Sequence, residues 1–132
     1  MSVSFAGLKK GSSYSRKHLA DLWGYEGYQA LARGLVTPRG DNKLILFITE
    51  GDGQQQTIQR YTNQFDGRVL TIEGPEDHFA EDRLLNSSES SDEIHLFHRV
   101  RHRSDFKYYG MLMLVESELH QGRPSSFTFI VA

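Results

Sequence analysis

The chain has 132 residues and a mass of 15.1 kDa, with 38% hydrophobic and 24% charged residues, which is the composition of one ordinary globular domain, residues 1–132. It contains no cysteine, which excludes a disulfide scaffold, a zinc knuckle and a thiol nucleophile and favours a reducing, cytoplasmic location. The longest apolar run covers only residues 44–48, far short of a membrane span. We therefore expect a single cytoplasmic domain that does not enter a membrane.

Charge is unevenly distributed along the chain, although the net charge is only −2. Residues 1–43 carry seven basic and three acidic side chains (net +4), residues 44–97 three and eleven (−8), and residues 98–132 five and three (+2). If the two basic ends meet in space, the protein has one positive and one negative face. The alternative is a set of solvated charges without a partner.

Two short helices are predicted before residue 35. Residues 16–23 form the first, because apolar side chains three and four positions apart share one face, and Gly24 ends it. Residues 26–33 form the second, which Gly34 closes. Residues 35–42 are then predicted to be extended and to run into a turn.

The remainder of the sequence predicts strands. Residues 43–49 are continuously apolar, the pattern of a central strand that is covered on both faces. A short helix is expected within the acidic stretch, at residues 78–84. The sequence therefore predicts an α+β fold, with two short N-terminal helices packed on a curved, mainly antiparallel sheet of about six strands. The further strands are expected at residues 57–61, 68–72, 94–100, 106–115 and 127–131.

The sequence lacks the motifs of the common hydrolases and nucleases. It has no Gly-Lys-Ser/Thr phosphate loop, no Gly-x-Ser-x-Gly elbow and no His-Asn-His constellation. His98 and His102 lie four positions apart, but the three arginines beside them would repel a dication. The triplet Asp41-Asn42-Lys43 precedes an apolar strand, whereas the similar triplet of another nuclease class ends one. We expect a binding module, not an enzyme, with no metal and no cofactor.

Basic and aromatic side chains are interleaved in both basic segments. Arginine and lysine contact phosphates, and tyrosine rings stack or pack against bases and sugars, so the mixture is typical of nucleic-acid binding. The alternative for any single tyrosine is a place in the core with its hydroxyl bonded. The residues concerned are Tyr14, Arg16, Tyr25, Tyr28, Arg33, Arg39, Lys43, Arg99, Arg101, Arg103, Tyr108 and Tyr109.

Three stretches carry a resemblance to a known family: residues 14–43 (YSRKHLADLWGYEGYQALARGLVTPRGDNK), 94–99 (IHLFHR) and 106–110 (FKYYG). They closely resemble the sulfur-binding domain of McrA-like, modification-dependent restriction endonucleases, over residues 14–129. That family recognises phosphorothioate DNA, in which sulfur replaces one non-bridging phosphate oxygen. Its nuclease chemistry belongs to a separate His-Asn-His domain. The resemblance therefore implies the reader module of a bacterial type IV restriction system.

The resemblance also implies a binding site. Sulfur is softer and more weakly hydrated than oxygen, so a shallow apolar cavity favours it, and the matching residues here are Tyr28, Ala32 and Pro38. Asp41 would repel phosphates unless it pairs with a neighbouring cation, Arg39 or Lys43, or accepts a hydrogen bond from a cytosine amino group. The candidate phosphate or base contacts are Arg16, Arg33, Arg39 and Lys43. Tyr14 and Ser15 are also candidate DNA-binding residues.

Three other functions stay open. A reader of another altered duplex, such as one with methylated cytosine, needs an aromatic cage for a flipped base, for which exposed Tyr25 or Trp23 would be suited. A protein-interaction module, as in a similar domain appended to some bacterial helicases, would have no affinity for DNA. A metal-dependent nuclease would lose cleavage on Asp41→Ala. For the leading hypothesis the partners are phosphorothioate duplex DNA and a His-Asn-His nuclease, on the same polypeptide or a separate one.

Overall fold

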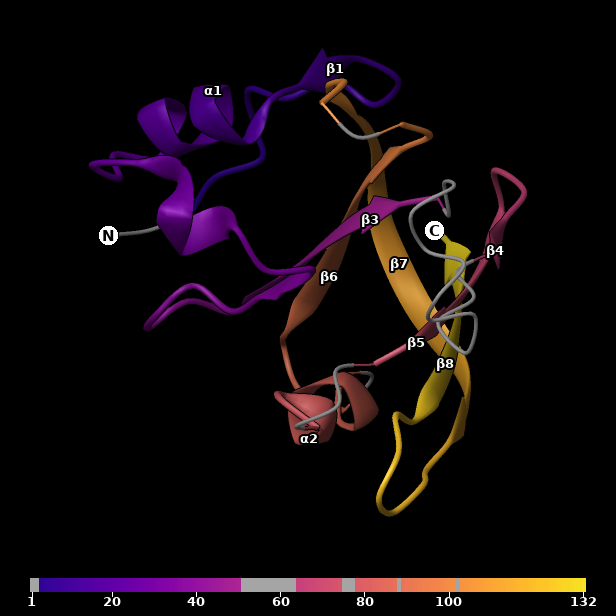
Figure 1. The fold of residues 1–132 in the computed structure, drawn as a ribbon. Helices are drawn as coiled ribbons and strands as arrows, with labels where there is room; N and C mark the ends of the chain where they lie inside the picture. Colours follow the sequence, from indigo (N-terminus) through magenta and orange to yellow (C-terminus); the bar gives the residue numbers. More distant parts are fainter. Residues whose placement is uncertain (1–2, 51–63, 75–77, 88, 102) are drawn as a thin grey trace.

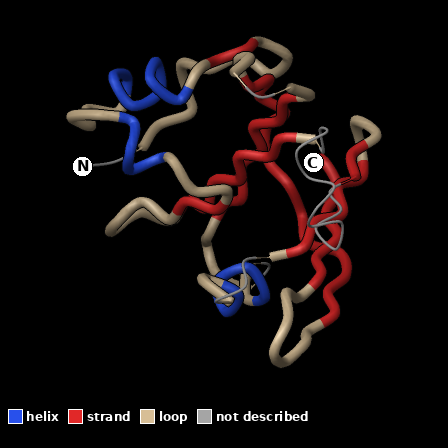
Figure 2. The backbone as a smooth tube through the Cα atoms, viewed as in Figure 1, coloured by secondary structure: helices blue, strands red, loops and turns tan. Residues whose placement is uncertain are grey.

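The computed structural model describes residues 3–50, 64–74, 78–87, 89–101 and 103–132. Figure 1 shows the fold as a ribbon, and Figure 2 distinguishes its helices from its strands. The helical segments are α1 (Arg16–Leu22), the 3₁₀ turn η1 (Tyr28–Leu31) and α2 (Glu81–Leu85). The strands are β1 (Ser13–Tyr14), β2 (Leu35–Val36), β3 (Lys43–Thr49), β4 (Gln64–Phe65), β5 (Val69–Glu73), β6 (Glu93–Arg99), β7 (Phe106–Glu118) and β8 (Ser126–Val131).

Within the described residues, eight strands form one sheet in the order β2-β3-β6-β7-β8-β5-β4, and β1 pairs with the start of β7. Every pair is antiparallel except β3 with β6, which run parallel with Lys43 beside Glu93 and Thr49 beside Arg99. Parallel neighbours require a long crossover, and here it contains β4, β5 and α2. The predicted α+β class with a mainly antiparallel sheet is confirmed.

The sheet is strongly bent, because two β-bulges interrupt the long strand β7. At the first, Leu96 pairs with Gly110 and Phe97 with Tyr108, so Tyr109 is the extra residue. Gly110 has φ 89°, a left-handed conformation that a side chain would strain. The second bulge falls beyond Leu114. β7 consequently curves through the middle of the molecule and joins the two halves of the sheet (Figure 1).

Alternate residues of β3 enter two different hydrophobic clusters. Leu44, Leu46 and Ile48 pack with β5, β8 and Leu84 of α2 on one face. Ile45 and Phe47 pack with α1, η1 and the N-terminal segment on the other. The prediction that this strand is covered on both faces is confirmed, although β3 lies beside the short β2 and not in the middle of the sheet.

Two parts of the predicted fold are wrong. The second N-terminal helix is only a four-residue 3₁₀ turn, and the second α-helix of the described chain is α2. The described sheet has eight strands instead of about six, because β1, β2 and β4 have two residues each and leave no periodic pattern. The strand predicted at residues 57–61 lies outside the described ranges.

Candidate nucleic-acid interface

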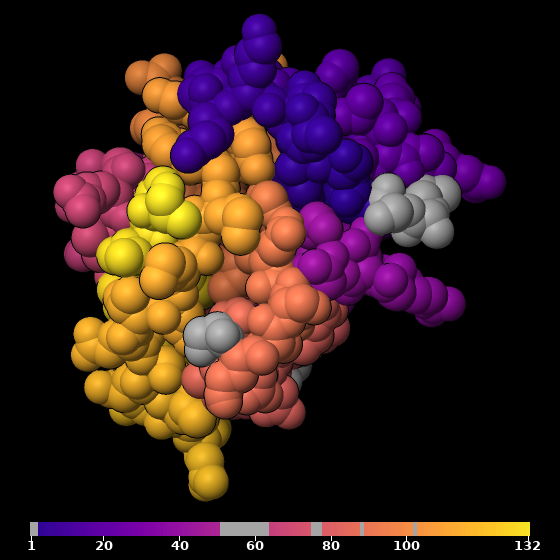
Figure 3. All heavy atoms as spheres, turned by 180° about the vertical axis from the view of Figure 1, so that it is seen from behind, coloured from indigo at the N-terminus to yellow at the C-terminus, as the bar shows by residue number. Residues whose placement is uncertain are grey.

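The pairing of β1 with β7 brings the two basic ends of the sequence together. Ser13 lies opposite Lys107 in the ladder, and Tyr108 exchanges backbone hydrogen bonds with residues 11 and 12 at 2.8 and 2.9 Å. Figure 3 shows the N-terminal residues, in indigo, against the orange start of β7. In contrast, the acid-rich segment around α2 lies at the opposite end of the molecule (Figure 1). Within the described residues, the two basic segments therefore meet at β1 and β7, and α2 lies away from them.

A hollow of about 340 Å³ opens where these basic segments meet, and we call it the arginine hollow. Its walls come from the start of α1, from η1 and from the turn between β6 and β7. Four cations line it against one carboxylate, that of Asp105, so its field is positive. The lining residues are Ser15, Arg16, Lys17, Tyr28, Arg99, Arg103, Ser104, Asp105 and Phe106.

Arg16 is held by aromatic rings. Its guanidinium carbon lies 4.8 Å from the ring centre of Phe47 and 4.9 Å from that of Phe106, and Nη2 donates to the carbonyl of Arg33 at 3.4 Å. Its Nε is buried and has no acceptor among the described residues. Burial, and then the positive charge of Arg99, lower the pKa of Arg16. The charge of this guanidinium is therefore poorly solvated.

Arg99 lies on the same ring. Its guanidinium carbon is 4.2 Å from the ring centre of Phe106, Nε donates to Thr49 Oγ1 at 2.8 Å, and Nη1 donates to the carbonyl of Ser104 at 3.1 Å. Burial lowers the pKa of Arg99 as well. Among the described residues no carboxylate forms an ion pair with Arg99 or with Arg16. Two partly buried like charges thus lie beside one aromatic ring and line one hollow, which favours an incoming anion.

The candidate sulfur pocket is not one hollow in this structure. Tyr28 lines the arginine hollow and is 51% exposed. Pro38 is buried and lines a second hollow of about 270 Å³ together with Arg33 and Arg39, which we call the proline hollow. Ala32 is the exposed C-cap of η1 and lines neither of them. Tyr28 thus lies with Arg16 and Arg99, whereas Pro38 lies with Arg33 and Arg39.

The remaining candidates of the first segment have local partners. Ser15 caps α1, since its side chain accepts a hydrogen bond from the backbone of His18 at 3.0 Å. Tyr14 accepts a hydrogen bond from the backbone of Lys9 at 2.9 Å. Arg33 lies over the ring of Phe79, with its guanidinium carbon 4.1 Å from the ring centre. These contacts order the walls around the two hollows.

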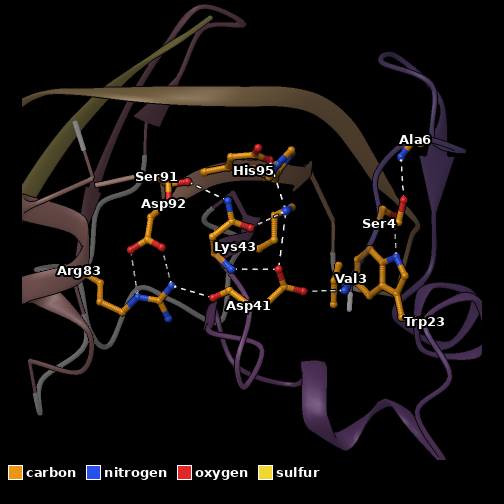
Figure 4. A network of polar contacts seen from close by, with 12 residues as sticks. Val3, Ser4, Ala6, Trp23, Asp41, Lys43, Arg83, Ser91, Asp92 and His95 are labelled. Atoms are coloured by element: carbon orange, nitrogen blue, oxygen red, sulfur yellow. Dashed lines mark hydrogen bonds and ion pairs between the residues drawn. The ribbon is translucent and has the colours of Figure 1, made fainter. Parts of the chain in front are cut away.

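Asp41 and Lys43 belong to a polar network at the start of β3 (Figure 4). Lys43 Nζ donates to Asn42 Oδ1 at 2.7 Å and lies 3.6 Å from Asp41 Oδ1 and 3.8 Å from Glu93 Oε1. Of the alternatives considered for Asp41, the ion pair with Lys43 is present, and the Asp41 side chain is only 6% exposed. The charges of both residues are thus compensated within the chain, which disfavours a role for either in binding phosphate.

The same network ties α2 to the start of β3. Arg83 donates to both carboxylate oxygens of Asp92, at 3.0 and 3.2 Å, and to the carbonyl of Asp41 at 3.2 Å. Asn42 Nδ2 donates to the carbonyl of Ser91 at 2.8 Å. These contacts fix the acidic segment beside the first residues of β3 and β6, away from β1. They also compensate part of the charge of the acidic segment. The network therefore has a structural role.

A third hollow of about 360 Å³ is mainly apolar, and we call it the apolar cavity. Leu46, Phe47, Ile72 and Leu84 contribute to its walls, together with Glu73 at the end of β5. Glu73 Oε1 is buried and has no hydrogen-bond partner among the described residues. A buried carboxylate oxygen of this kind can accept a hydrogen bond from an amino group of a ligand.

Sequence reasoning named Arg99 and Arg103 in the basic and aromatic set but did not place them in one site with Arg16. The cluster Arg99, Arg101 and Arg103 was visible as a run of charge, but nothing in the sequence indicated that it lies beside Arg16. In the residues that the structure describes, no group of three or more His, Asp or Glu side chains could hold a metal ion. His102 lies outside the described ranges. No helix in those ranges is long and apolar enough to cross a bilayer.

Comparison with known proteins identifies solved structures that share the fold of this chain. No family model and no curated protein matches the sequence. Among solved structures, the SRA domain of SUVH5 in complex with hemi-methylated CG DNA matches with a TM-score of 0.63 and 15% identity, covering 100% of this chain and 94% of that one. The complex with fully methylated CG DNA matches with a TM-score of 0.61, also at 15% identity, with the same coverage. The modification-dependent restriction endonuclease AspBHI matches with a TM-score of 0.53 and 12% identity over 98% of this chain and 79% of that one. The chain therefore has the fold of SRA domains.

Proposed function

We propose that this chain is a reader of modified double-stranded DNA that binds without cleaving. The fold is shared with SRA domains solved on methylated CG DNA and with a modification-dependent restriction endonuclease. The observation that carries the proposal is the arginine hollow, where Arg16 and Arg99 lie on the ring of Phe106 without an acidic partner among the described residues. Cations held in this way attract the phosphates of a duplex.

The distribution of charge supports one orientation of the duplex. Lys9, Lys10 and Lys107 are exposed in the segments that flank the arginine hollow. The exposed acids Asp82 and Glu89 lie with α2 at the far end and would repel a phosphate backbone. We therefore propose that DNA lies across the end formed by β1, α1 and the β6–β7 turn. Binding should weaken steeply as salt rises.

For the modification itself we propose a phosphorothioate. The proposal rests on the resemblance of residues 14–43 to sulfur-binding domains and on the presence of the half-exposed Tyr28 ring in the same hollow as Arg16 and Arg99. Sulfur is weakly hydrated, so an aromatic wall beside a guanidinium penalises it less than it penalises oxygen. Cleavage of such DNA would require a His-Asn-His nuclease, on the same polypeptide or a separate one.

A second candidate is an altered base, and the apolar cavity favours it. Its volume and its apolar walls suit an unstacked base, and Glu73 Oε1 could accept a hydrogen bond from an exocyclic amino group. In this alternative, Tyr25 and Trp23 do not form the aromatic cage around the flipped base. Trp23 is buried with Nε1 bonded to the carbonyl of Ser4 at 2.9 Å, and Tyr25 lines the proline hollow.

The test is a salt titration of the protein with three duplexes of one sequence: unmodified, with one phosphorothioate, and with one 5-methylcytosine. We expect all three to bind at low salt and to weaken as salt rises, because phosphate contacts release counterions. Tighter binding of the phosphorothioate duplex that persists at high salt supports the sulfur reader.

Each remaining outcome selects another function. Preference for the methylated duplex, lost in Glu73→Gln, supports the base reader. Equal affinity for all three duplexes contradicts a reader and leaves a general DNA-binding module. Absence of binding to any duplex contradicts the proposal and favours a protein-interaction module. Asp82→Gln, an exposed change on α2, is the matched control for Glu73→Gln.

A further inference from the structure

Arg16 and Arg99 approach one aromatic ring from segments that are far apart in the sequence. Their guanidinium carbons lie 4.9 and 4.2 Å from the centre of the Phe106 ring, so the two carbons are at most about 9 Å apart. Each charge is partly buried, and no carboxylate among the described residues pairs with either. Without an anion the two cations repel each other in a medium that screens them poorly.

We propose that Arg16 and Arg99 together bind a single phosphate group of the DNA backbone, with the ring of Phe106 as the platform that sets their spacing. This inference rests on the proposed function and names the contact through which the arginine hollow holds DNA. The ligand class is a phosphodiester, whether its non-bridging atoms are both oxygen or one is sulfur. The resemblance to sulfur-binding domains implied Arg16 as a contact and did not imply Arg99.

The two side chains keep enough hydrogen-bond donors to share one tetrahedral anion. A guanidinium has five N–H groups. Contacts with protein oxygens use one N–H of Arg16, through Nη2, and two of Arg99, through Nε and Nη1. The remaining terminal N–H groups are available for a shared acceptor. Because Thr49 and Ser104 already orient Arg99, and two rings hold Arg16, little side-chain entropy remains to be lost on binding.

A phosphate shared by two arginines predicts coupled effects of mutation. Removing either arginine should weaken binding of the unmodified duplex about tenfold, because a hydrogen-bonded charge pair is lost. Once one arginine has been removed, removing the other should weaken duplex binding much less than the first removal did. The reason is that a single arginine no longer has a partner in holding the anion. The slope of log affinity against log salt should fall by about one in the single variants and by no more in the double variant.

The experiment measures duplex affinity for Arg16→Gln, Arg99→Gln and the double variant across salt concentrations. Arg123→Gln is the matched control, because Arg123 is exposed in the turn beyond the far end of β7, where Nη2 lies 3.1 Å from His120 Nδ1. Arg16→Lys and Arg99→Lys keep the charge but lose the forked guanidinium, and they should recover only part of the affinity. Thermal unfolding identifies any variant that fails to fold.

A second measurement needs no variant. The side-chain N–H resonances of Arg16 and Arg99 in the natural chain should shift together, with one apparent affinity, when inorganic phosphate is added, while that of Arg123 should not. Additive losses and a salt slope that falls by two in the double variant would overturn the shared phosphate, as would DNA binding that is unchanged in both single variants. Joint phosphate shifts without any affinity for DNA would keep the anion site and overturn the proposed function instead.

Discussion

Asp41 Oδ2 accepts a hydrogen bond from the backbone N–H of Val3 at 2.7 Å, across 38 positions of the sequence. Its other oxygen accepts from the backbone of Asn42 at 2.9 Å and faces Lys43. The carboxylate is nearly buried, so its removal leaves two backbone donors without this acceptor and removes one ion-pair partner of Lys43. We expect Asp41→Ala to lower the free energy of unfolding by about 2 kcal/mol, measured by urea denaturation.

The exposed acid Asp21 on α1 provides the control, because Asp21→Ala removes the same charge without a buried partner. If Asp41→Ala were as stable as the unchanged protein and bound DNA less well, Asp41 would be a DNA contact. This is the outcome required if Asp41 accepts a hydrogen bond from a cytosine amino group. If the stability falls and the affinity of the folded fraction is unchanged, its role is to anchor the N-terminal segment.

His95 is a second point at which the N-terminal segment is held, and it should make the fold sensitive to acid. Its ring stacks on Phe5 with 3.6 Å between ring centres, Nδ1 lies 2.7 Å from the Tyr108 hydroxyl, and Nε2 lies 2.9 Å from Glu93 Oε1. Burial raises the pKa of Tyr108 to about 12, so the hydroxyl stays protonated and donates to Nδ1, while Nε2–H donates to Glu93.

Burial lowers the pKa of His95 below its usual 6.5, against the opposing effect of Glu93, and the charge of Lys43 lowers it further. The folded state therefore binds a proton less readily than the unfolded state. The stabilising contribution of neutral His95 is complete above pH 6.5 and is lost as pH falls through the folded-state pKa. Urea denaturation at pH 7.5 and 5.5 should show a smaller loss in His95→Gln than in the unchanged chain. An equal loss in both, with the exposed His18→Gln as control, would contradict this.

The parts of the fold that the sequence predicted are those that depend on local pattern. The spacing of apolar residues placed α1, and the continuous apolar run placed β3, because both patterns report burial of a single element. The common position of Arg16 and Arg99 beside Phe106 depends on the pairing of the two-residue β1 with β7. A two-residue strand has no periodic pattern in the sequence, so its pairing could not be predicted. Sequence reasoning therefore found each basic cluster but not that the clusters share one hollow.

The geometry assumed for the sulfur pocket failed for a different reason. Tyr28 and Ala32 were placed on one face of an α-helix, where residues four positions apart lie above one another. The segment is instead a 3₁₀ turn that ends at Leu31, with three residues per turn, so residues four positions apart no longer lie above one another. Ala32 becomes the cap of this turn. Short segments between glycines are where such a distinction is hardest to read from spacing.

Tyr28 should affect selectivity more than stability. Because its ring is half-exposed in the arginine hollow, Tyr28→Ala should change the free energy of unfolding by less than about 1 kcal/mol. We expect the preference for a phosphorothioate duplex over an unmodified one to fall several-fold, while affinity for the unmodified duplex changes little. The same loss on both duplexes would remove Tyr28 from sulfur selection. Met113→Ala, an exposed change on β7, is the control.

Arg39 tests whether DNA extends from the arginine hollow to the proline hollow. Arg39 is exposed and lines the proline hollow with Pro38, so Arg39→Glu should leave stability within about 0.5 kcal/mol of the unchanged chain. If Arg39 contacts phosphate, the reversal weakens binding of modified and unmodified duplexes alike, by about tenfold or more, and reduces the salt slope. Arg123→Glu makes the same change in net charge at the β7–β8 turn. Equal losses in the two variants would show an effect of net charge alone, and no loss in Arg39→Glu would confine the duplex to the end formed by β1 and α1.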